Sequence, residues 1–139
     1  MVLALGADVR FYTELALDGG MLYIRPMTDD VVCDLASREC VPCRGGIPPL
    51  TPEQRQPLLE QLSGWQVVDG HHLKKEYAFE NFVDALAFVN RVGAVAEYNG
   101  HHPDLYLTWG KVRIEIYTYK IDGLTESDFV LAAKCDQVL

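Results

Sequence analysis

The sequence is short of basic residues, and those it has do not cluster. Lysine and arginine number 12 against 20 aspartates and glutamates, which gives a formal net charge of −8 at pH 7. Nucleic-acid backbones and anionic membrane surfaces are bound through clustered positive charge. The shortage therefore argues against direct nucleic-acid binding and against a membrane surface as the main partner.

Long hydrophobic runs are also missing from the sequence. No segment approaches the roughly 20 apolar residues that a membrane-spanning helix needs. Residues 1–8 lack the positively charged segment that opens a signal peptide, and their apolar run is short. We therefore expect a cytoplasmic protein.

Cysteine is scarce, with four residues in the chain: Cys33, Cys40, Cys43 and Cys135. The spacing of Cys40 and Cys43 is that of a CxxC pair, but the sequence has no second CxxC pair. A structural zinc site needs four convergent ligands. Nothing in the sequence indicates an oxidising compartment, so we expect free, metal-free thiols.

The chain divides into two parts of different character. Residues 1–50 contain short apolar pieces and no sustained hydrophobic period over residues 1–30. They end in a glycine- and proline-rich stretch that is typical of a loop. We predict an N-terminal extension over residues 1–50, partly irregular or disordered. Residues 51–139 would form the folded domain.

Regular elements are indicated from residue 51 onward. Thr51 and Gln54 form a capping box that opens a helix ending near Ser63-Gly64, with Pro57 in its interior as a possible kink. Strands over residues 65–69 and 73–79 flank a turn at Gly70-His71-His72, which predicts a hairpin. Apolar residues at helical spacing then predict a helix of about 18 residues from Glu80.

The remaining sequence predicts two strands and a last helix. The strands cover residues 105–109 and 111–119, and the second alternates between apolar and polar side chains. Thr125 is the expected N-cap of the final helix. The predicted order is α-β-β-α-β-β-α. Two hairpins separated by a helix favour a four-stranded antiparallel sheet with three helices on one face, an α+β fold.

A histidine pair just beyond the long helix is the main candidate for chemistry. Glu97 lies one helical turn before His101, and Pro103 follows His102. Two imidazoles in one cleft can exchange protons near neutral pH. A capping or hydrogen-bonded structural pair is the alternative on spacing alone. By contrast, His71 and His72 are interpreted as polar residues of a turn.

The stretches Glu97-x-x-x-His101-His102-Pro103 and Gly123-Leu124-Thr125-Glu126-Ser127-Asp128-Phe129, with Trp109, resemble the signature of the pterin-4a-carbinolamine dehydratases. That family is also known as the dimerization cofactor of a homeodomain transcription factor. The likeness runs from about Cys40 to Leu139, and residues 1–26 match nothing typical of the family. The family fold agrees with the element order predicted above.

The resemblance implies dehydration of a 4a-hydroxytetrahydropterin to the quinonoid dihydropterin, as in tetrahydrobiopterin recycling, without metal or cofactor. Protonation of the 4a-hydroxyl and removal of the N5 proton are transfers suited to histidine. His101 and His102 would carry them. The expected substrate-binding or orienting residues are Glu97, Pro103, Thr118 and Asp128.

The sequence departs from the family pattern at Tyr119, where a third histidine is normally found. The strand alternation predicts that Tyr119 points at the cleft. A phenol, with a pKa near 10, can donate a hydrogen bond but is a poor base at pH 7. We therefore predict either that Tyr119 serves as a weaker third catalytic group or that the site has lost activity.

Two functions from different classes follow from the resemblance. The first is an active dehydratase that takes a pterin substrate and forms a homo-oligomer, either a dimer or a tetramer. The second is a dehydratase-like scaffold that binds a protein, as a coactivator or as a Rubisco assembly factor. Retention of Glu97, His101, His102 and Asp128 favours the enzyme, and Tyr119 favours the scaffold.

Overall fold

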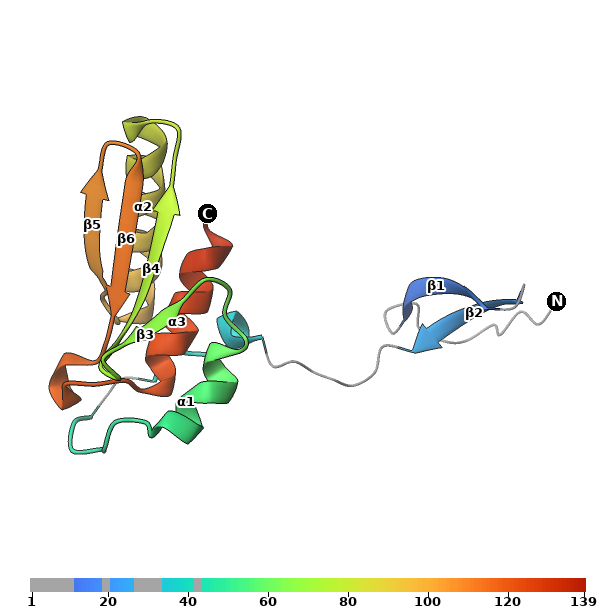
Figure 1. Ribbon diagram of the computed structural model, residues 1–139, viewed down its shortest axis with the longest axis horizontal. Coiled ribbons are helices and arrows are strands. Elements are labelled where there is room, and N and C mark those ends of the chain that lie inside the picture. The colour runs from blue at the N-terminus through green and yellow to red at the C-terminus, as the bar shows by residue number, and fades with distance from the viewer. Residues whose placement is uncertain (1–11, 19–20, 27–33, 42–43) are drawn as a thin grey trace. The chain divides into compact units, whose positions relative to one another are not determined.

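The computed structural model describes residues 12–18, 21–26, 34–41 and 44–139, in two compact units, Met1–Cys33 and Asp34–Leu139. In the first unit, β1 (Tyr12–Asp18) pairs antiparallel with β2 (Met21–Pro26). Sequence analysis missed these strands, because residues 1–30 carry no sustained period. The second unit, coloured from cyan to red in Figure 1, holds the predicted α+β fold.

The second unit is built on a four-stranded antiparallel sheet in the order β3-β4-β6-β5. Its strands are β3 (Gln66–Val68), β4 (His72–Ala78), β5 (Asp104–Thr108) and β6 (Lys111–Ile116). Leu73 lies opposite Ile116, and Tyr77 opposite Val112, in the central pair of strands. All four side chains are buried, so one face of the sheet is the core face.

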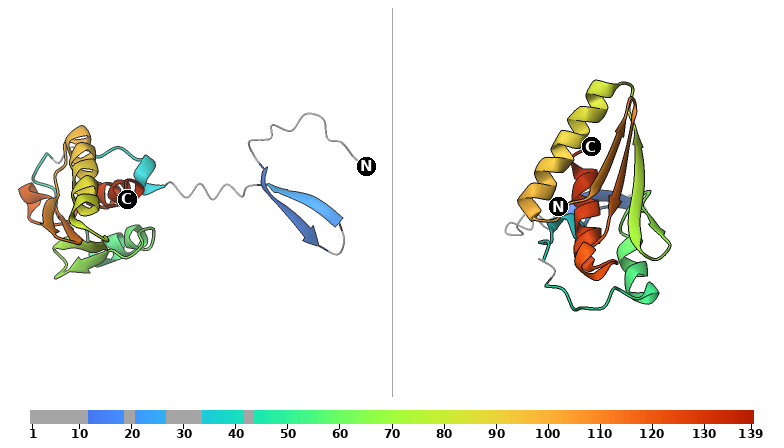
Figure 2. Two further views of the ribbon diagram at one scale, coloured as in Figure 1. Left: turned by 90° about the horizontal axis from the view of Figure 1, so that it is seen from above. Right: turned by 90° about the vertical axis from the view of Figure 1, so that its left-hand side faces the viewer.

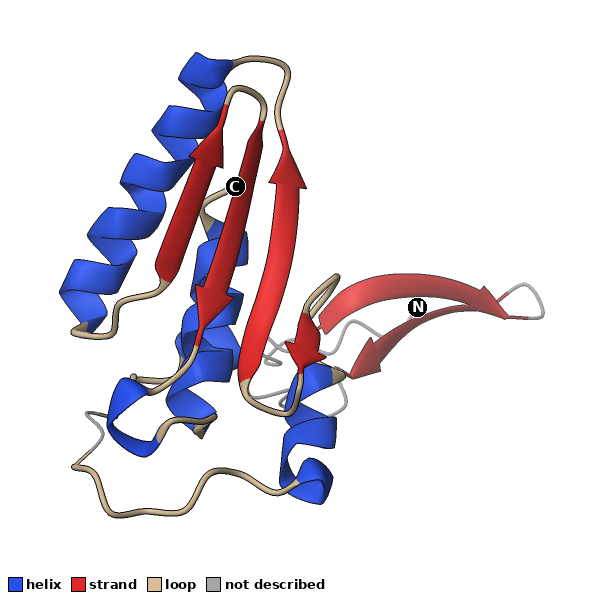
Figure 3. Cartoon of the chain, turned by 60° about the vertical axis from the view of Figure 1, so that its left-hand side comes forward, coloured by secondary structure: helices blue, strands red, loops and turns tan. Residues whose placement is uncertain are grey.

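The helices α2 (Phe82–Asn99) and α3 (Glu126–Gln137) cover that face, as the side-on views show (Figures 2 and 3). The third helix, α1 (Pro52–Leu59), packs against α3. Phe88 and Val92 of α2 and Phe129 of α3 are fully buried in one cluster with the sheet residues. The predicted α+β fold, with its antiparallel sheet and three helices, is confirmed.

The capping box at the start of α1 is present, with the Thr51 hydroxyl accepting from Gln54 N and the Gln54 side chain accepting from Thr51 N. The helix ends at Leu59, earlier than predicted, and contains Pro57. Beyond it, Leu62 N donates to Leu59 O over three residues. The chain therefore continues toward Ser63 in tightened turns rather than as α-helix.

The second unit starts well before the capping box. The 3-10 turn η2 (Leu35–Ser37) packs against α3, and Leu35 is 2% exposed in the core. Leu50 N donates to Leu124 O at 2.9 Å. The predicted domain boundary at residue 50 stays a prediction, although these contacts join part of residues 34–50 to the core. Within the described residues, no helix is long and apolar enough to cross a membrane.

The chain leaves β6 at Ile116, three residues earlier than predicted. Asp104, the first residue of β5, pairs with Glu115, so β5 provides no partner residue beyond that point. Thr118 instead forms an isolated bridge with Gly123, and the 3-10 turn η3 (Tyr119–Ile121) lies between them. Tyr119 is therefore on a turn, and the prediction that it continues the strand is wrong.

Gly123 ends this turn in close contact with Pro49, which precedes α1. A Cβ added there would lie 2.8 Å from the Cβ and Cγ atoms of Pro49. The carbonyl of Gly123 also accepts from Thr118 N at 2.8 Å. Only glycine permits this close approach, which fixes the end of η3 beside the start of α3.

Candidate active site

The end of α2 places the histidine pair. Gly100 adopts the left-handed conformation, with φ 62°, and its N–H donates to the carbonyls of Ala96 and Glu97. His101 N donates to Ala96 O at 3.2 Å. A glycine in this conformation is the usual end of a helix, and it turns the chain out of the helical path. His101 and His102 are thereby held at the C-terminal end of α2.

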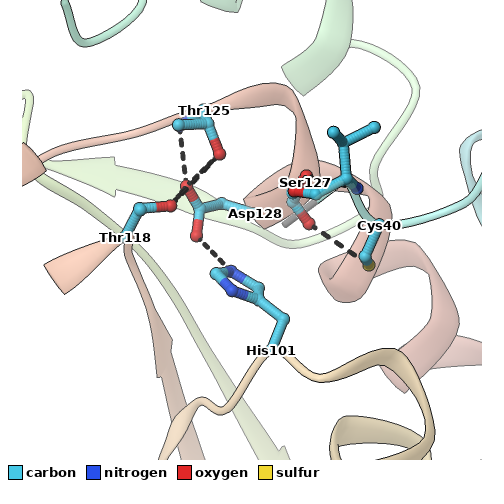
Figure 4. Close-up of polar contacts among 7 residues, drawn as sticks. Cys40, His101, Thr118, Thr125, Ser127 and Asp128 are labelled. Atoms are coloured by element: carbon cyan, nitrogen blue, oxygen red, sulfur yellow. Dashed lines mark hydrogen bonds and ion pairs between the residues drawn. The ribbon is translucent and has the colours of Figure 1, made fainter. Parts of the chain in front are cut away.

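Asp128, in the first turn of α3, is a fully buried carboxylate with a partner at each oxygen (Figure 4). Its Oδ2 accepts from Thr118 Oγ1 at 2.9 Å, from Thr125 N at 2.7 Å and from Thr125 Oγ1 at 3.1 Å. Its Oδ1 lies 2.6 Å from His101 Nε2. The buried charge is thus balanced by hydrogen bonds and by one imidazole, as burial of a charge requires.

The carboxylate sets the tautomer of His101. An ionised carboxylate only accepts hydrogen bonds, so Nε2 of His101 must carry the proton that it shares with Asp128. Nδ1 is then the ring nitrogen with a free lone pair whenever the imidazole is neutral. The His101 side chain is 17% exposed, which keeps most of the ring out of water.

His102 has a different environment. Its Nε2 lies 2.9 Å from Glu97 Oε2, and the two side chains are 63% and 83% exposed. The contact joins the last turn of α2 to the third residue beyond its end. Glu97 therefore orients His102 rather than His101, whereas the spacing of four residues had pointed to His101.

One pocket brings the two histidines together with the η3 turn. It encloses about 230 Å³ and is lined by Gly100, His101, His102, Tyr117, Thr118, Tyr119 and Lys120. Glu97 and Asp128 act on it through the histidines, and Pro103 is not among its lining residues. A larger, mostly apolar pocket of about 450 Å³ lies between described residues of the segments 39–41 and 44–50 and the start of α3, but no histidine lines it.

Tyr119 lines the pocket, but its hydroxyl is hydrogen-bonded outside it. The hydroxyl donates to Asp104 Oδ1 at the start of β5, and the side chain is 58% exposed. This hydrogen bond raises the pKa of Tyr119 above its ordinary value of 10.0. The phenol is therefore protonated at neutral pH and already bonded, so it is unsuited to exchange a proton.

Three pocket features escaped the sequence analysis. Tyr117 packs against Tyr119 in a tilted arrangement with ring centroids 4.3 Å apart, Lys120 lines the pocket, and Asp104 accepts from Tyr119. The alternation that placed Tyr117 and Tyr119 on one side of the chain was a signal for the first. No local sequence pattern predicts the contact between Asp104 and Tyr119, because the two residues lie on different elements.

Cys40 and Cys135 are free thiols, whereas Cys33 and Cys43 lie outside the described residues. Burial raises the pKa of Cys135 to about 12 and also raises that of Cys40. Among the described residues, no group of three or more histidine, cysteine, aspartate or glutamate side chains could hold a metal ion.

Comparison with known proteins identifies the family. The profile of the pterin 4 alpha carbinolamine dehydratase family matches residues 48–138. A protein of Rubrobacter xylanophilus, provisionally named a pterin-4-alpha-carbinolamine dehydratase, is 57% identical over 105 residues, covering 76% of this chain and 98% of the relative. A protein of Alkaliphilus metalliredigens with the same provisional name is 50% identical over 105 residues, covering 75% of this chain and 95% of its own.

Solved structures are similar too. The crystal structure of a transcriptional coactivator/pterin dehydratase from Brucella melitensis has a TM-score of 0.62 at 30% identity, covering 65% of this chain and 97% of that one. A pterin dehydratase-like protein identified as a RuBisCO assembly factor in the alpha-carboxysome reaches only 0.48 at 23%, covering 55% and 89%. The profile match and the identities show that the chain belongs to the pterin 4 alpha carbinolamine dehydratase family.

Proposed function

We propose that the protein is a pterin-4a-carbinolamine dehydratase that eliminates water from a 4a-hydroxytetrahydropterin by histidine acid–base catalysis. The observation that carries the proposal is the contrast between two adjacent histidines in one pocket. One is backed by the buried Asp128 at 2.6 Å, and the other is exposed beside Glu97. Such a pair can divide the roles of base and acid.

His101 is the proposed base. Its Nε2 proton is shared with Asp128, so the lone pair on Nδ1 is the one available to take the N5 proton of the pterin. The imidazolium that forms is stabilised by the buried carboxylate. A positioned base of this kind contributes about 10²–10⁴-fold to the rate.

His102 is the proposed acid. As an imidazolium beside Glu97 it gives a proton to the 4a-hydroxyl, which leaves as water while the C4a–N5 double bond forms. The N5 proton passes to His101, so protons and charge balance over the step. His102 is 63% exposed and regains its proton from solvent, and His101 returns its own.

The surrounding pocket suits a flat bicyclic substrate. The adjoining rings of Tyr117 and Tyr119 offer an aromatic wall on which a pterin can stack, and Thr118 and Lys120 lie beside them. In this scheme Tyr119 binds the pterin but moves no proton, because its hydroxyl donates to Asp104. The proposed reaction therefore runs on two histidines.

A scaffold function is the second candidate, and the engaged hydroxyl of Tyr119 is the observation that favours it. Partner binding also has a possible surface. Val83 on α2 is 72% exposed and Phe82 43%, and β3 and β5 are edge strands of the sheet. Unpaired edges and exposed apolar side chains support the expected homo-oligomer, whether dimer or tetramer.

Stopped-flow dehydration of a synthetic 4a-carbinolamine tests the proposal. The wild type should accelerate formation of the quinonoid dihydropterin well above the rate in buffer, for at least one 4a stereoisomer. Gln66→Ala, on the exposed part of β3, is the control that should retain the wild-type rate. Absence of acceleration by a folded wild type would support the scaffold instead.

A further inference from the structure

His71 in the β3–β4 turn, which the sequence suggested was only a polar turn residue, is connected to the pocket. His71 packs on Tyr117 with ring centroids 4.6 Å apart, and Tyr117 packs on Tyr119 at 4.3 Å. The three rings form a series that begins in the β3–β4 turn and ends at the pocket wall. His71 itself is not a lining residue.

The outer end of this series is held in place by two polar contacts. His71 Nε2 lies 2.9 Å from Asp122 Oδ1, and His71 Nδ1 lies 3.2 Å from His72 Nδ1. Asp122 follows η3 directly, in the left-handed conformation with φ 51°. His71 therefore touches the η3 region twice, once through the Tyr117 ring and once through Asp122.

The inner end is held as well. The Tyr119 hydroxyl donates to Asp104, so the η3 turn is fixed to β5 on one side and to the β3–β4 turn on the other. Without His71, the Tyr117 ring would lose its outer neighbour. Tyr117 is half-buried and also packs against the hydrophobic core, whereas Tyr119 is exposed, so His71 is the ring that Tyr117 meets on the side of the β3–β4 turn.

We propose that His71 is a positioning residue for the substrate, acting through the Tyr117–Tyr119 wall on which the pterin stacks. The inference rests on the proposed function, because it assumes that the ligand is a pterin. His71 lies outside the pocket and takes no part in proton transfer. Its removal should therefore weaken binding while leaving the chemical step to His101 and His102.

Steady-state dehydration kinetics and equilibrium binding of 7,8-dihydropterin test the inference. His71→Ala should raise KM and the dihydropterin Kd about two- to tenfold, which is what one aromatic pair supplies, with kcat changed less than about twofold. His71→Phe should restore most of the loss, because a phenyl ring can pack on Tyr117 without bonding Asp122. A merely structural role would lower thermal stability without this split between KM and kcat.

Asp122 and Asp69 offer a matched pair of substitutions. Both residues have φ 51° and are exposed, but only Asp122 contacts His71. Asp122→Asn should raise KM by up to about twofold, as expected for an exposed contact. Asp69→Asn, in the same turn as His71, should leave KM unchanged. Equal effects of the two would contradict a specific contact.

A ligand-free measurement separates failure of this inference from failure of the proposed function. The ring resonances of Tyr119 should shift in His71→Ala and return toward wild-type values in His71→Phe. If the wild type turns over but His71→Ala has unchanged KM and Kd, the inference fails and the dehydratase stands. If the wild type neither binds nor turns over pterins, the proposed function fails and substrate positioning fails with it. Unshifted Tyr119 resonances would overturn the ring series in either case.

Discussion

The two sides of the pocket differ in how they hold their histidine. On the α3 side, Asp128 is 0% exposed and accepts hydrogen bonds from Thr118 and Thr125 in addition to its contact with His101. On the α2 side, Glu97 and His102 meet at the surface with no such backing. A fixed imidazole suits a base of defined tautomer, whereas an exposed one suits exchange with solvent. Adjacent residues of one type thus acquire separate roles from their surroundings.

The largest difference between the two sides should be in stability. Asp128→Ala removes a buried charge and leaves His101, Thr118 and Thr125 without their acceptor, so it should cost about 3–5 kcal/mol of unfolding free energy. Glu97→Ala is the matched control and should change it by less than about 1 kcal/mol. Urea denaturation measures both. If Asp128→Ala does not fold, Asp128→Asn takes its place. Equal losses of unfolding free energy at Asp128 and Glu97 would contradict the difference between the two sides.

Substitution of each histidine should separate rate from stability. His101→Ala and His102→Ala should each lower the dehydration rate by at least about 10²-fold, the low end for a positioned acid or base. Only His101→Ala should also destabilise the fold, because it leaves Asp128 without its imidazole partner. Stopped-flow rates and denaturation midpoints decide this. A stable His101→Ala, or a destabilised His102→Ala, would reverse the assignment of the two sides.

α3 also carries a buried group that stays neutral, which sharpens the contrast with Asp128. Burial raises the pKa of Cys135 to about 12, whereas the thiol of the unfolded chain ionises near 8.5–9. Cys135 therefore contributes its full stability below about pH 9, and this contribution is lost as pH rises toward 12. At pH 10 the loss should be about 1–2 kcal/mol. Cys135→Ala should weaken this alkaline dependence, measured by denaturation at pH 7 and pH 10.

The smallest effects belong to Tyr119. Tyr119→Phe removes only the hydrogen bond to Asp104 and should cost about 0.5–1.5 kcal/mol at most in stability or binding. Tyr119→His should raise the rate toward one or both 4a stereoisomers, because an imidazole exchanges protons near neutral pH. Activity that appears only in Tyr119→His would show that the wild-type site is a relic in a binding scaffold.

The sequence predicted the elements whose signals are local. The capping box at Thr51, the helical spacing from Phe82 to Ala96 and the alternation along β6 each report on neighbouring residues. These signals were enough for the element order and the antiparallel sheet.

Contacts between distant segments could not be predicted from such signals. Asp104 and Tyr119 meet because β6 ends where its partner strand begins, and His71 meets Asp122 because the β3–β4 turn lies beside the turn after η3. Both depend on the register of the sheet. The pairing of His101 with Asp128 was inferred only as a shared cleft, through the family resemblance. The contact of Glu97 with His102 rather than with His101 depends on how the chain turns at Gly100, which the sequence did not predict.

The central claim is that Asp128 fixes His101 as the imidazole whose Nδ1 is free to accept a proton. Nitrogen-15 NMR of the histidine side chains at mildly alkaline pH tests it directly, because it distinguishes the two neutral tautomers. The account predicts that His101 carries its proton on Nε2 in the wild type, and that Asp128→Asn abolishes this preference. A wild-type His101 with its proton on Nδ1 would contradict this assignment, because the lone pair on Nε2 would then face a protonated Asp128 and could not take the N5 proton of the pterin.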